Sequence, residues 1–408
     1  MDRPPTTPSS VKRPPRRIAI LTHSYYEEDP RVRREAEALA AAGDRIEVFA
    51  LRRPADPERE TIDGVEVRRL GVQRHQGASL AVYLREYLSF FVRSGVALTR
   101  AHARRRFGLV QVHTLPDFLV FATLPLRLTG VPVILDMHEA MPEFFASRFR
   151  GRTGWLGRFL VAAQERAAVR FASAVVAVND ALGDRLTRMG VPSSKVTIIR
   201  NVPSLARFEP REHPDRPFMI DGTLRLVYAG ALSPIYELDV VLDAMAALAM
   251  RRPTLDVTLD LYGRDFDEVP LRDQAIRLGI ADRVRFHGRI PIEAVPAAIA
   301  AGDVGLAPTR RTPFTDYSLS TKIFEYAAMG RPVIATNLPM VTRTFDEDVL
   351  TYVPGDPEDL ARDMLCLVDE PEERAARVRR ARHRLHDLSW ETESARLFAL
   401  VDALGTGD

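Results

Sequence analysis

The chain has 408 residues, of which 46% are hydrophobic and 27% are charged, and its 57 basic and 55 acidic residues leave a net charge of only +2. This composition excludes wholesale disorder, predicts two large domains and gives no charge-based reason to expect nucleic-acid binding. The single cysteine, Cys366, excludes an internal disulfide and a cysteine-rich zinc site.

Residues 1–16 are rich in proline and arginine and are predicted to form a disordered arm. They lack the apolar core of a secretory signal, and no apolar stretch of the chain is long enough to span a membrane. The sequence therefore predicts a cytoplasmic protein.

In the region 17–203, short β-branched runs alternate with amphipathic stretches. This alternation predicts parallel βαβ units in a first Rossmann-like domain. The strand-like runs lie at 17–22, 45–51, 65–71, 109–113, 132–137, 174–179 and 195–200, and the clearest helical stretches lie at 31–42 and 165–171.

Residues 204–222 are charged and rich in proline without any period, which predicts a linker. The alternation then restarts and predicts a second Rossmann-like domain over 223–388, followed by a helix and tail at 389–408. Its strand-like runs lie at 224–229, 257–262, 283–287, 304–307, 332–336 and 349–353, and its helical patterns at 237–250, 271–278, 293–301, 320–329 and 357–369.

Ligands of open parallel sheets bind beyond the carboxyl ends of the strands. Three histidines of the first domain follow such ends, namely His23, His113 and His138, and Glu139 comes next to the last of them. A histidine at this place can donate a hydrogen bond to a substrate. An alternative for His113 is that it only caps a helix that begins near Pro116.

The segment around Lys322 is the strongest candidate site in the second domain. It begins at Ser320, where free backbone N–H groups and the helix dipole suit a phosphate. Lys322 opposes that dipole in the first turn, which a bound anion would explain, and Glu325 on the same face could accept hydrogen bonds from a ribose. Arg310 could complete an anion clamp. The alternatives are a capped helix with a surface Lys–Glu pair and a solvated arginine loop.

Several signals are absent from the sequence. There is no spacing typical of metal ligands, no Gly-x-Gly-x-x-Gly and no Walker A loop, which argues against a metal site, a classical NAD enzyme and a P-loop kinase. No cofactor is expected. The stretch 78–107 combines aromatic residues with arginines, so it could lie on an anionic membrane, although we favour a helix that packs its aromatic stripe on the sheet.

Taken together, these residues resemble glycosyltransferase family 4, which has the GT-B fold. The resemblance covers nearly the whole chain and is carried by VHTLPD (112–117), LVYAGAL (226–232), GDVGLAP (302–308) and, most specifically, STKIFEYAAMGRPVIAT (320–336). It implies two domains facing across a cleft, with the last helix crossing back to the first domain. It also implies retaining, metal-independent transfer of a sugar from a nucleotide-diphosphate donor on the C-terminal domain to an acceptor on the N-terminal one.

By position, the resemblance implies that Glu325 holds the donor ribose and that Thr321, Lys322 and the start of the helix at Ser320 face the diphosphate. It implies that His113 is the active-site histidine near the transferred sugar. The nucleobase would meet the backbone of a loop formed by Gly288, Arg289 and Ile290.

This sequence departs from the family pattern in two places. Tyr317 stands where the family's Glu-x7-Glu motif has its first glutamate. The loop after Gly230 lacks the basic residue that usually contacts the diphosphate, so that Lys322, Arg310 and Arg264 would have to supply the positive charge.

The expected function is transfer of a sugar from a UDP- or GDP-type donor to a glycan or lipid-linked acceptor in cell-surface polysaccharide or glycoconjugate assembly. Peripheral contact with the inner face of the cell membrane is a further expectation. Two alternatives stay open: a nucleotide-sugar 2-epimerase of the same fold, and a non-catalytic partner subunit that binds a nucleotide-sugar.

Overall fold

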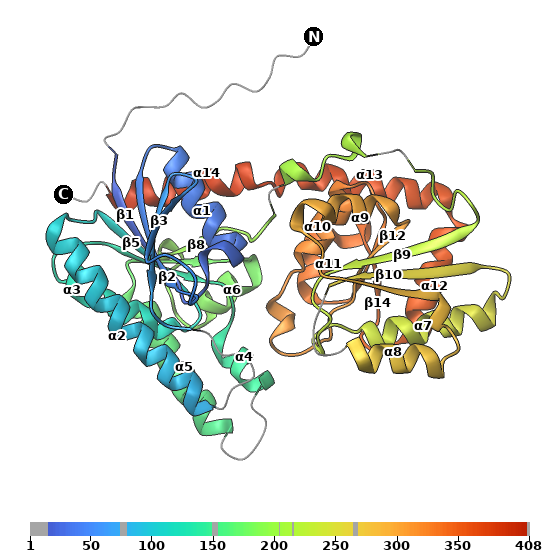
Figure 1. Ribbon diagram of the computed structural model, residues 1–408, viewed down its shortest axis with the longest axis horizontal. Coiled ribbons are helices and arrows are strands. Elements are labelled where there is room, and N and C mark those ends of the chain that lie inside the picture. The colour runs from blue at the N-terminus through green and yellow to red at the C-terminus, as the bar shows by residue number, and fades with distance from the viewer. Residues whose placement is uncertain are drawn as a thin grey trace, which may run out of the picture.

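The computed structural model describes residues 15–73, 80–148, 154–203, 205–213, 216–263 and 268–405, which build two βα domains (Figure 1). The strands of the N-terminal sheet are β1 (Arg17–Leu21), β2 (Arg45–Leu51), β3 (Arg59–Ile62), β4 (Val65–Leu70), β5 (Leu109–His113), β6 (Val133–Met137), β7 (Ala174–Ala177) and β8 (Val196–Ile198). They are ordered β3-β4-β2-β1-β5-β6-β7-β8. Residues 18–21 of β1 are fully buried, as expected where helices cover both faces of a parallel sheet.

The edge strand β3 is the one element of this sheet that the alternation did not predict. It pairs antiparallel with β4 through a tight turn at Asp63 and Gly64, which have φ angles of 49° and 81°. Asp-Gly is the dipeptide that such a hairpin turn requires, because both of its central residues need a positive φ. The signal was therefore present in the sequence.

The helices of the N-terminal domain are α1 (Pro30–Ala41), α2 (Leu80–Arg104), α3 (Leu124–Arg127), α4 (Met141–Arg148), α5 (Gly154–Phe171) and α6 (Asp180–Arg188). Helix α1 begins where the Asp29 side chain accepts a hydrogen bond from the backbone N–H of Val32. The aromatic face of α2 packs inward, since Phe90 is fully buried and the ring of Phe91 contacts Phe118. Among the described residues, no helix has the length and apolarity needed to cross a bilayer.

The second sheet contains β9 (Thr223–Ala229), β10 (Asp256–Tyr262), β11 (Val284–Gly288), β12 (Val304–Ala307), β13 (Val333–Thr336) and β14 (Leu350–Tyr352). All of its pairings are parallel, in the order β11-β10-β9-β12-β13-β14. Its helices are α7 (Leu238–Arg251), α8 (Glu268–Arg277), α9 (Val295–Ala301), α10 (Thr321–Ala328), α11 (Pro339–Phe345) and α12 (Pro357–Asp369).

Two helices end the chain, α13 (Pro371–Asp387) and α14 (Trp390–Gly405). Helix α14 runs back across the N-terminal domain (Figure 1), where Leu397 and Val401 are fully buried and Glu393 pairs with Arg200 at 3.2 Å. The predicted crossover is thus confirmed. Helix α13 was not predicted, and only Ala381 and Leu385 of its 17 residues are buried, so it carries almost no apolar period.

Candidate active site

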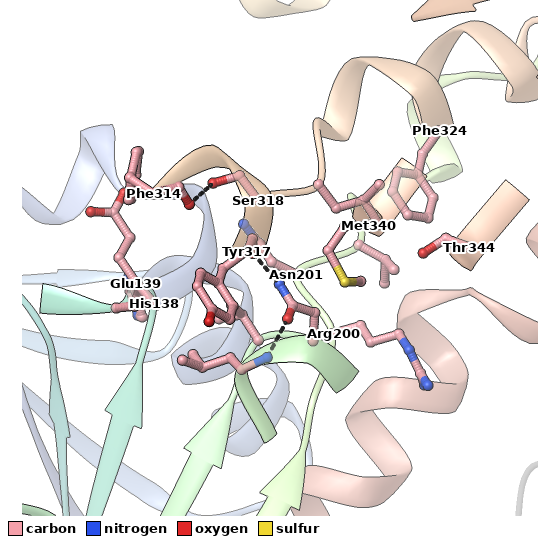
Figure 2. Close-up of a pocket in the computed structure, with 16 residues that line it drawn as sticks. His138, Glu139, Arg200, Asn201, Phe314, Tyr317, Ser318, Phe324, Met340 and Thr344 are labelled. Carbon is pink, nitrogen blue, oxygen red and sulfur yellow. Dashed lines mark hydrogen bonds between the residues drawn. The ribbon is translucent and has the colours of Figure 1, made fainter. Parts of the chain in front are cut away.

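A cavity of roughly 160 Å³ lies between the two domains (Figure 2). Its N-terminal side follows the carboxyl ends of β6, β7 and β8 and carries the polar residues His138, Glu139, Asn179, Arg200 and Asn201 beside a few apolar ones. Its C-terminal side is largely apolar, with Phe314, Tyr317, Leu319, Phe324 and Met340. The cavity therefore occupies the place where parallel sheets bind their ligands.

His138, and not His113, borders this cavity. The His113 side chain has no exposed surface, whereas 21% of the His138 side chain is exposed. His113 lies directly behind, with its Nδ1 atom 2.9 Å from Nε2 of His138. Any contact of this histidine pair with a molecule in the cavity would be made by His138.

Both imidazoles are neutral at neutral pH. Burial lowers the pKa of His113 to about 4, against the opposing effect of Asp136, and burial also lowers the pKa of His138. One of the two facing nitrogens must then carry the proton of their hydrogen bond. The pair is a neutral hydrogen-bonding unit with one ring at the cavity.

The ligand atoms of His113, Asp136 and His138 lie within 4.8 Å of one another, close enough to hold a metal ion. However, the Asp136 carboxylate already pairs with Arg31 at 2.9 Å, and the two histidines use their facing nitrogens on each other. A cation there would have to break both interactions beside a guanidinium. These residues do not fit a metal, and the expectation of metal independence stays a prediction.

The Lys322 side chain lies over the carboxyl end of β9. Its Nζ atom is 4.3 Å from the ring centroid of Tyr236 and 5.2 Å from that of Tyr228. A Cβ atom at Gly230 would collide with the lysine chain, and one at Gly263 would collide with the Gly230 carbonyl. Gly230 thus allows the end of β9 to approach the Lys322 side chain, and Gly263 allows the end of β10 to approach Gly230.

Glu325 lies one turn after Lys322 on the same helix. Burial raises its pKa to about 7, while Lys322 and Arg207 act to lower it. The side chain of Ser320 makes no capping bond at the start of α10, where Thr321 is the first helical residue. The helix start, a cation and a half-buried carboxyl group thus lie together on α10, and their binding of a nucleotide stays a prediction.

Arg310 has a partner within the chain. It forms a bidentate ion pair with Asp239 at 2.8 and 2.9 Å and donates to the Pro234 carbonyl, beside a second cavity at the start of α7. Its charge is therefore compensated, and a role as an anion clamp would require it to leave Asp239. Arg289 is exposed after β11 and Ile290 is half-buried, while Arg264 lies outside the described residues.

His23 is buried beneath α2 and is not among the residues that line the cavity between the domains. Its Nε2 atom lies 3.2 Å from a carboxylate oxygen of Glu86, and its ring packs edge-on against Tyr87 and Phe90. Its predicted acceptor-side role would therefore have to act through α2.

Tyr317, which replaces the first motif glutamate, joins the two domains. Its carbonyl accepts a hydrogen bond of 2.6 Å from the Asn179 side chain, and its ring packs on the N-terminal core. The neighbouring Phe314 contacts Phe144 with ring centroids 5.3 Å apart. The motif position therefore forms a contact between the two domains in this chain.

Sequence reasoning assigned no role to the apolar side of the cavity. Phe314, Phe324 and Met340 come from three separate segments, and nothing in their spacing distinguishes them from core residues. Arg200 could have been found, because it is the last residue of the strand-like run 195–200 that contains β8.

Comparisons with known protein families identify both domains. A family described as a glycosyl transferase 4-like domain matches residues 29–202, and one described as glycosyl transferases group 1 matches residues 223–370. The chain is therefore a glycosyltransferase with the GT-B fold, and it belongs to glycosyltransferase family 4.

The relatives are enzymes that transfer sugars. The chain is 27% identical over 375 residues to a glycogen synthase of Mycobacterium tuberculosis, covering 87% of this chain and 86% of that protein. It is 27% identical over 282 residues to a GDP-mannose-dependent phosphatidylinositol dimannoside mannosyltransferase of the same species, covering 68% and 69%.

Solved structures share the fold. A sucrose-phosphate synthase of Thermosynechococcus elongatus superimposes with a TM-score of 0.76 at 20% identity, covering 96% of this chain and all of that one. An Anabaena protein in complex with UDP and glucose superimposes with a TM-score of 0.71 at 17% identity, covering 95% and 100%.

Proposed function

We propose that this glycosyltransferase transfers a sugar, with retention, from a nucleotide-diphosphate donor to a glycan or lipid-linked acceptor in the assembly of a cell-surface polysaccharide or glycoconjugate. The observation that carries the proposal is the arrangement of Lys322 and Glu325 on α10, across the strand ends from the cavity that His138 borders. Two similar proteins support the nucleotide, since one was solved with UDP and another is named as GDP-mannose-dependent.

The chemistry follows from where charge develops. Breaking the anomeric C–O bond leaves negative charge on the departing diphosphate, which Lys322 and the N–H groups at the start of α10 would stabilise. Glu325 would accept hydrogen bonds from the ribose, which does not change during the reaction. His138 would donate or accept a hydrogen bond at the transferred sugar. The donor phosphate itself would help to remove the proton of the acceptor hydroxyl.

Membrane attachment is part of this proposal, but the face of α2 differs from the predicted one. Leu84, Leu88, Val92 and Val96 are spaced by four and have exposed fractions of 49, 56, 59 and 44%. They form an outward apolar stripe, defined here as the α2 stripe, on the side opposite the buried Phe90. The predicted aromatic residues face the protein and not solvent.

The exposed charged residues of α2 and of α5 are of one sign. The only acidic residue of α2, Glu86, points inward to His23, and the only one of α5, Glu165, pairs inward with Arg185 at 2.9 Å. The arginines are exposed, including Arg85, Arg93, Arg100 and Arg104 on α2 and Arg158 and Arg166 on α5. An anionic bilayer is the surface that matches both features.

Incubation with radiolabelled UDP- and GDP-sugars and a membrane extract tests the function. Label in lipid or polymer is the expected result. A changed free sugar nucleotide would instead identify an epimerase, although the similar proteins described above are named as transferases. The absence of both, with retained nucleotide binding, would leave a non-catalytic partner subunit.

A further inference from the structure

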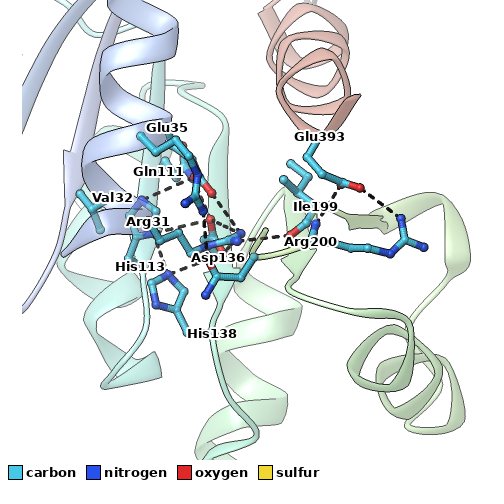
Figure 3. Close-up of polar contacts among 12 residues, drawn as sticks. Arg31, Val32, Glu35, Gln111, His113, Asp136, His138, Ile199, Arg200 and Glu393 are labelled. Atoms are coloured by element: carbon cyan, nitrogen blue, oxygen red, sulfur yellow. Dashed lines mark hydrogen bonds and ion pairs between the residues drawn. The ribbon is translucent and has the colours of Figure 1, made fainter. Parts of the chain in front are cut away.

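A group of buried polar side chains lies behind the two histidines (Figure 3). Arg31 of α1 reaches β6, where its Nη2 atom lies 2.9 and 3.1 Å from the two carboxylate oxygens of Asp136. Gln111 of β5 donates to Asp136 at 3.0 Å and to Glu35 at 2.6 Å. Asp136, Gln111 and Glu35 have no exposed surface, so these contacts are made without water competing for them.

Asp136 faces the nitrogens that the histidines share. Its carboxylate lies 3.5 Å from Nδ1 of His113 and 3.8 Å from Nε2 of His138. An ionised carboxylate can only accept hydrogen bonds, so it favours a proton on the nitrogens that face it. It thereby disfavours the tautomers in which both of those nitrogens lack a proton.

We propose that Asp136, held in place by Arg31, is a positioning residue that fixes the tautomers and orientation of the His113–His138 pair, and so determines which ring nitrogen His138 presents to the cavity. The arrangement is a property of the free protein. Only its consequence for turnover rests on the proposed function.

The charges of the group agree with this role. Burial acts to raise the pKa of Asp136, but the Arg31 guanidinium beside it has the opposite effect and the pKa is lowered, so this carboxylate stays ionised. Burial raises the pKa of Glu35 to about 8, so that side chain is largely protonated at pH 7. Arg31 and Asp136 then form a neutral pair in which the aspartate charge faces the rings.

Two further charged groups of α1 and its cap face the histidines. Asp29, before α1, accepts a hydrogen bond of 3.2 Å from the backbone N–H of Val32. Burial lowers the pKa of Arg34 to about 10, which leaves it charged at neutral pH. Within the part of the chain that the structure describes, neither Asp29 nor Arg34 forms a hydrogen bond with an imidazole. Asp136, in contrast, lies between the two rings and the guanidinium of Arg31.

Arg31 also fixes a third strand. Its Nη1 atom donates to the carbonyl of Ile199 at 3.3 Å, and the next residue, Arg200, lines the cavity and pairs with Glu393 of α14 (Figure 3). One buried guanidinium therefore holds the ends of β6 and β8 together at the cavity.

The test replaces Asp136 by Asn, which keeps the shape and removes the charge. In protein whose histidines are labelled with ¹⁵N, NMR signals of the ring nitrogens report the tautomer of each imidazole. They should show one tautomer for each of His113 and His138 in the parent and a mixture in Asp136→Asn. The kcat should fall by about ten- to a hundredfold, because the hydrogen bonds of Arg31 would go to a neutral amide and the charge facing the rings would be gone, with nucleotide affinity unchanged. Unaltered ring signals in Asp136→Asn would overturn the proposal.

Two controls separate positioning from folding. Asp303 is a fully buried aspartate that pairs with Arg216 at 2.7 Å in the other domain, so Asp303→Asn should lower stability without changing the histidine signals or kcat. Arg31→Met/Asp136→Asn removes both charges and should regain stability relative to Asp136→Asn, because no buried charge is left unpaired. If that double variant also regained parental tautomers and kcat, the positioning role would be wrong.

The outcome does not depend on finding the sugar donor. If no donor supports turnover, the proposed function fails, yet the ring signals still decide on the role of Asp136. If turnover is found but the signals and the pH profile of kcat are the same in Asp136→Asn and parent, only the positioning role fails.

Discussion

The two halves of the candidate active site differ in how their charges are satisfied. In the N-terminal half, Asp136 is paired with Arg31 and is in contact with both histidines without any ligand. In the C-terminal half, the contacts recorded for the described residues give the Lys322 ammonium only aromatic rings, and give the Glu325 carboxylate no hydrogen bond. The first half is preorganised by the fold, whereas under the proposed function the second would be completed by a bound nucleotide.

The largest effect is expected at Lys322. If its positive charge were not needed for turnover, the contrast between the two halves of the site would not hold. Lys322→Ala should lower kcat by about ten- to a hundredfold, more than it raises the donor KM, because the lysine pairs with a charge that grows as the bond breaks. Steady-state kinetics measure both parameters. Lys195→Ala is the matched control, since that lysine donates to the Arg170 carbonyl at 3.2 Å and is not among the residues that line the cavity, and its kinetics should equal the parent's.

Glu325 should lower the stability of the ligand-free protein at high pH. Its folded-state pKa of about 7 lies above the ordinary 4.5, so ionisation is disfavoured in the folded state and stability falls as pH rises from about 4.5 through 7. Glu325→Gln should therefore be more stable than the parent at pH 8, as measured by denaturant unfolding. It should also bind nucleoside diphosphate about tenfold more weakly above pH 7.

The same two proteins test the ribose role. The difference in nucleotide affinity between parent and Glu325→Gln should shrink below pH 7, where the parent's carboxyl group is protonated, and calorimetry at several pH values measures it. An affinity equal to the parent's at pH 8 would mean that Glu325 does not hold the ribose.

The sequence allowed the C-terminal half to be predicted more completely than the N-terminal half. Ser320, Lys322 and Glu325 lie within a few residues of one another, and their chemistry follows from local helix geometry, which one sequence can show. Arg31, Asp136 and Arg200 come from three elements far apart in the chain, so their meeting depends on strand order. Strand periodicity gave the sheets but not the order β5-β6 that sets His113 behind His138.

Exposure also had to come from the structure. The stretch 78–107 was expected to pack through its aromatic residues, and it does, but its other face is apolar as well. Leu88 and Val92 could have filled a core as easily as Phe90, and only packing shows that they face outward. Helix α13 was not predicted for the opposite reason, because a helix with almost no apolar residues shows no hydrophobic periodicity.

The α2 stripe adds a further difference between the two domains, since the proposed membrane contact lies on the N-terminal domain alone. Leu88→Ser/Val92→Ser should reduce co-sedimentation with phosphatidylglycerol vesicles several-fold. Replacing Arg93 by Ala should weaken binding about fivefold, because one charge near an anionic surface contributes ~1 kcal/mol. Met250→Ser/Val269→Ser, which changes exposed apolar residues of the other domain, should bind as the parent does. Equal losses in both double variants, or parental binding by the first, would refute this assignment.

The smallest effect is expected for one of the contacts that join the two halves. Asn179 uses its carbonyl oxygen to cap α6 at the N–H of Leu182 and its amide to bind the Tyr317 carbonyl. Asn179→Asp keeps the cap but sets a carboxylate against that carbonyl, so the cleft should open around the linker and the start of α14. Small-angle scattering should show a larger radius of gyration than the parent's without nucleotide, and compaction when nucleotide completes the C-terminal half. Asn337→Asp adds the same charge to an exposed position of the second domain and should leave the radius unchanged. If Asn179→Asp had the parental radius in both states, Tyr317 would not be holding the cleft closed, and its place in the glutamate motif would need another explanation.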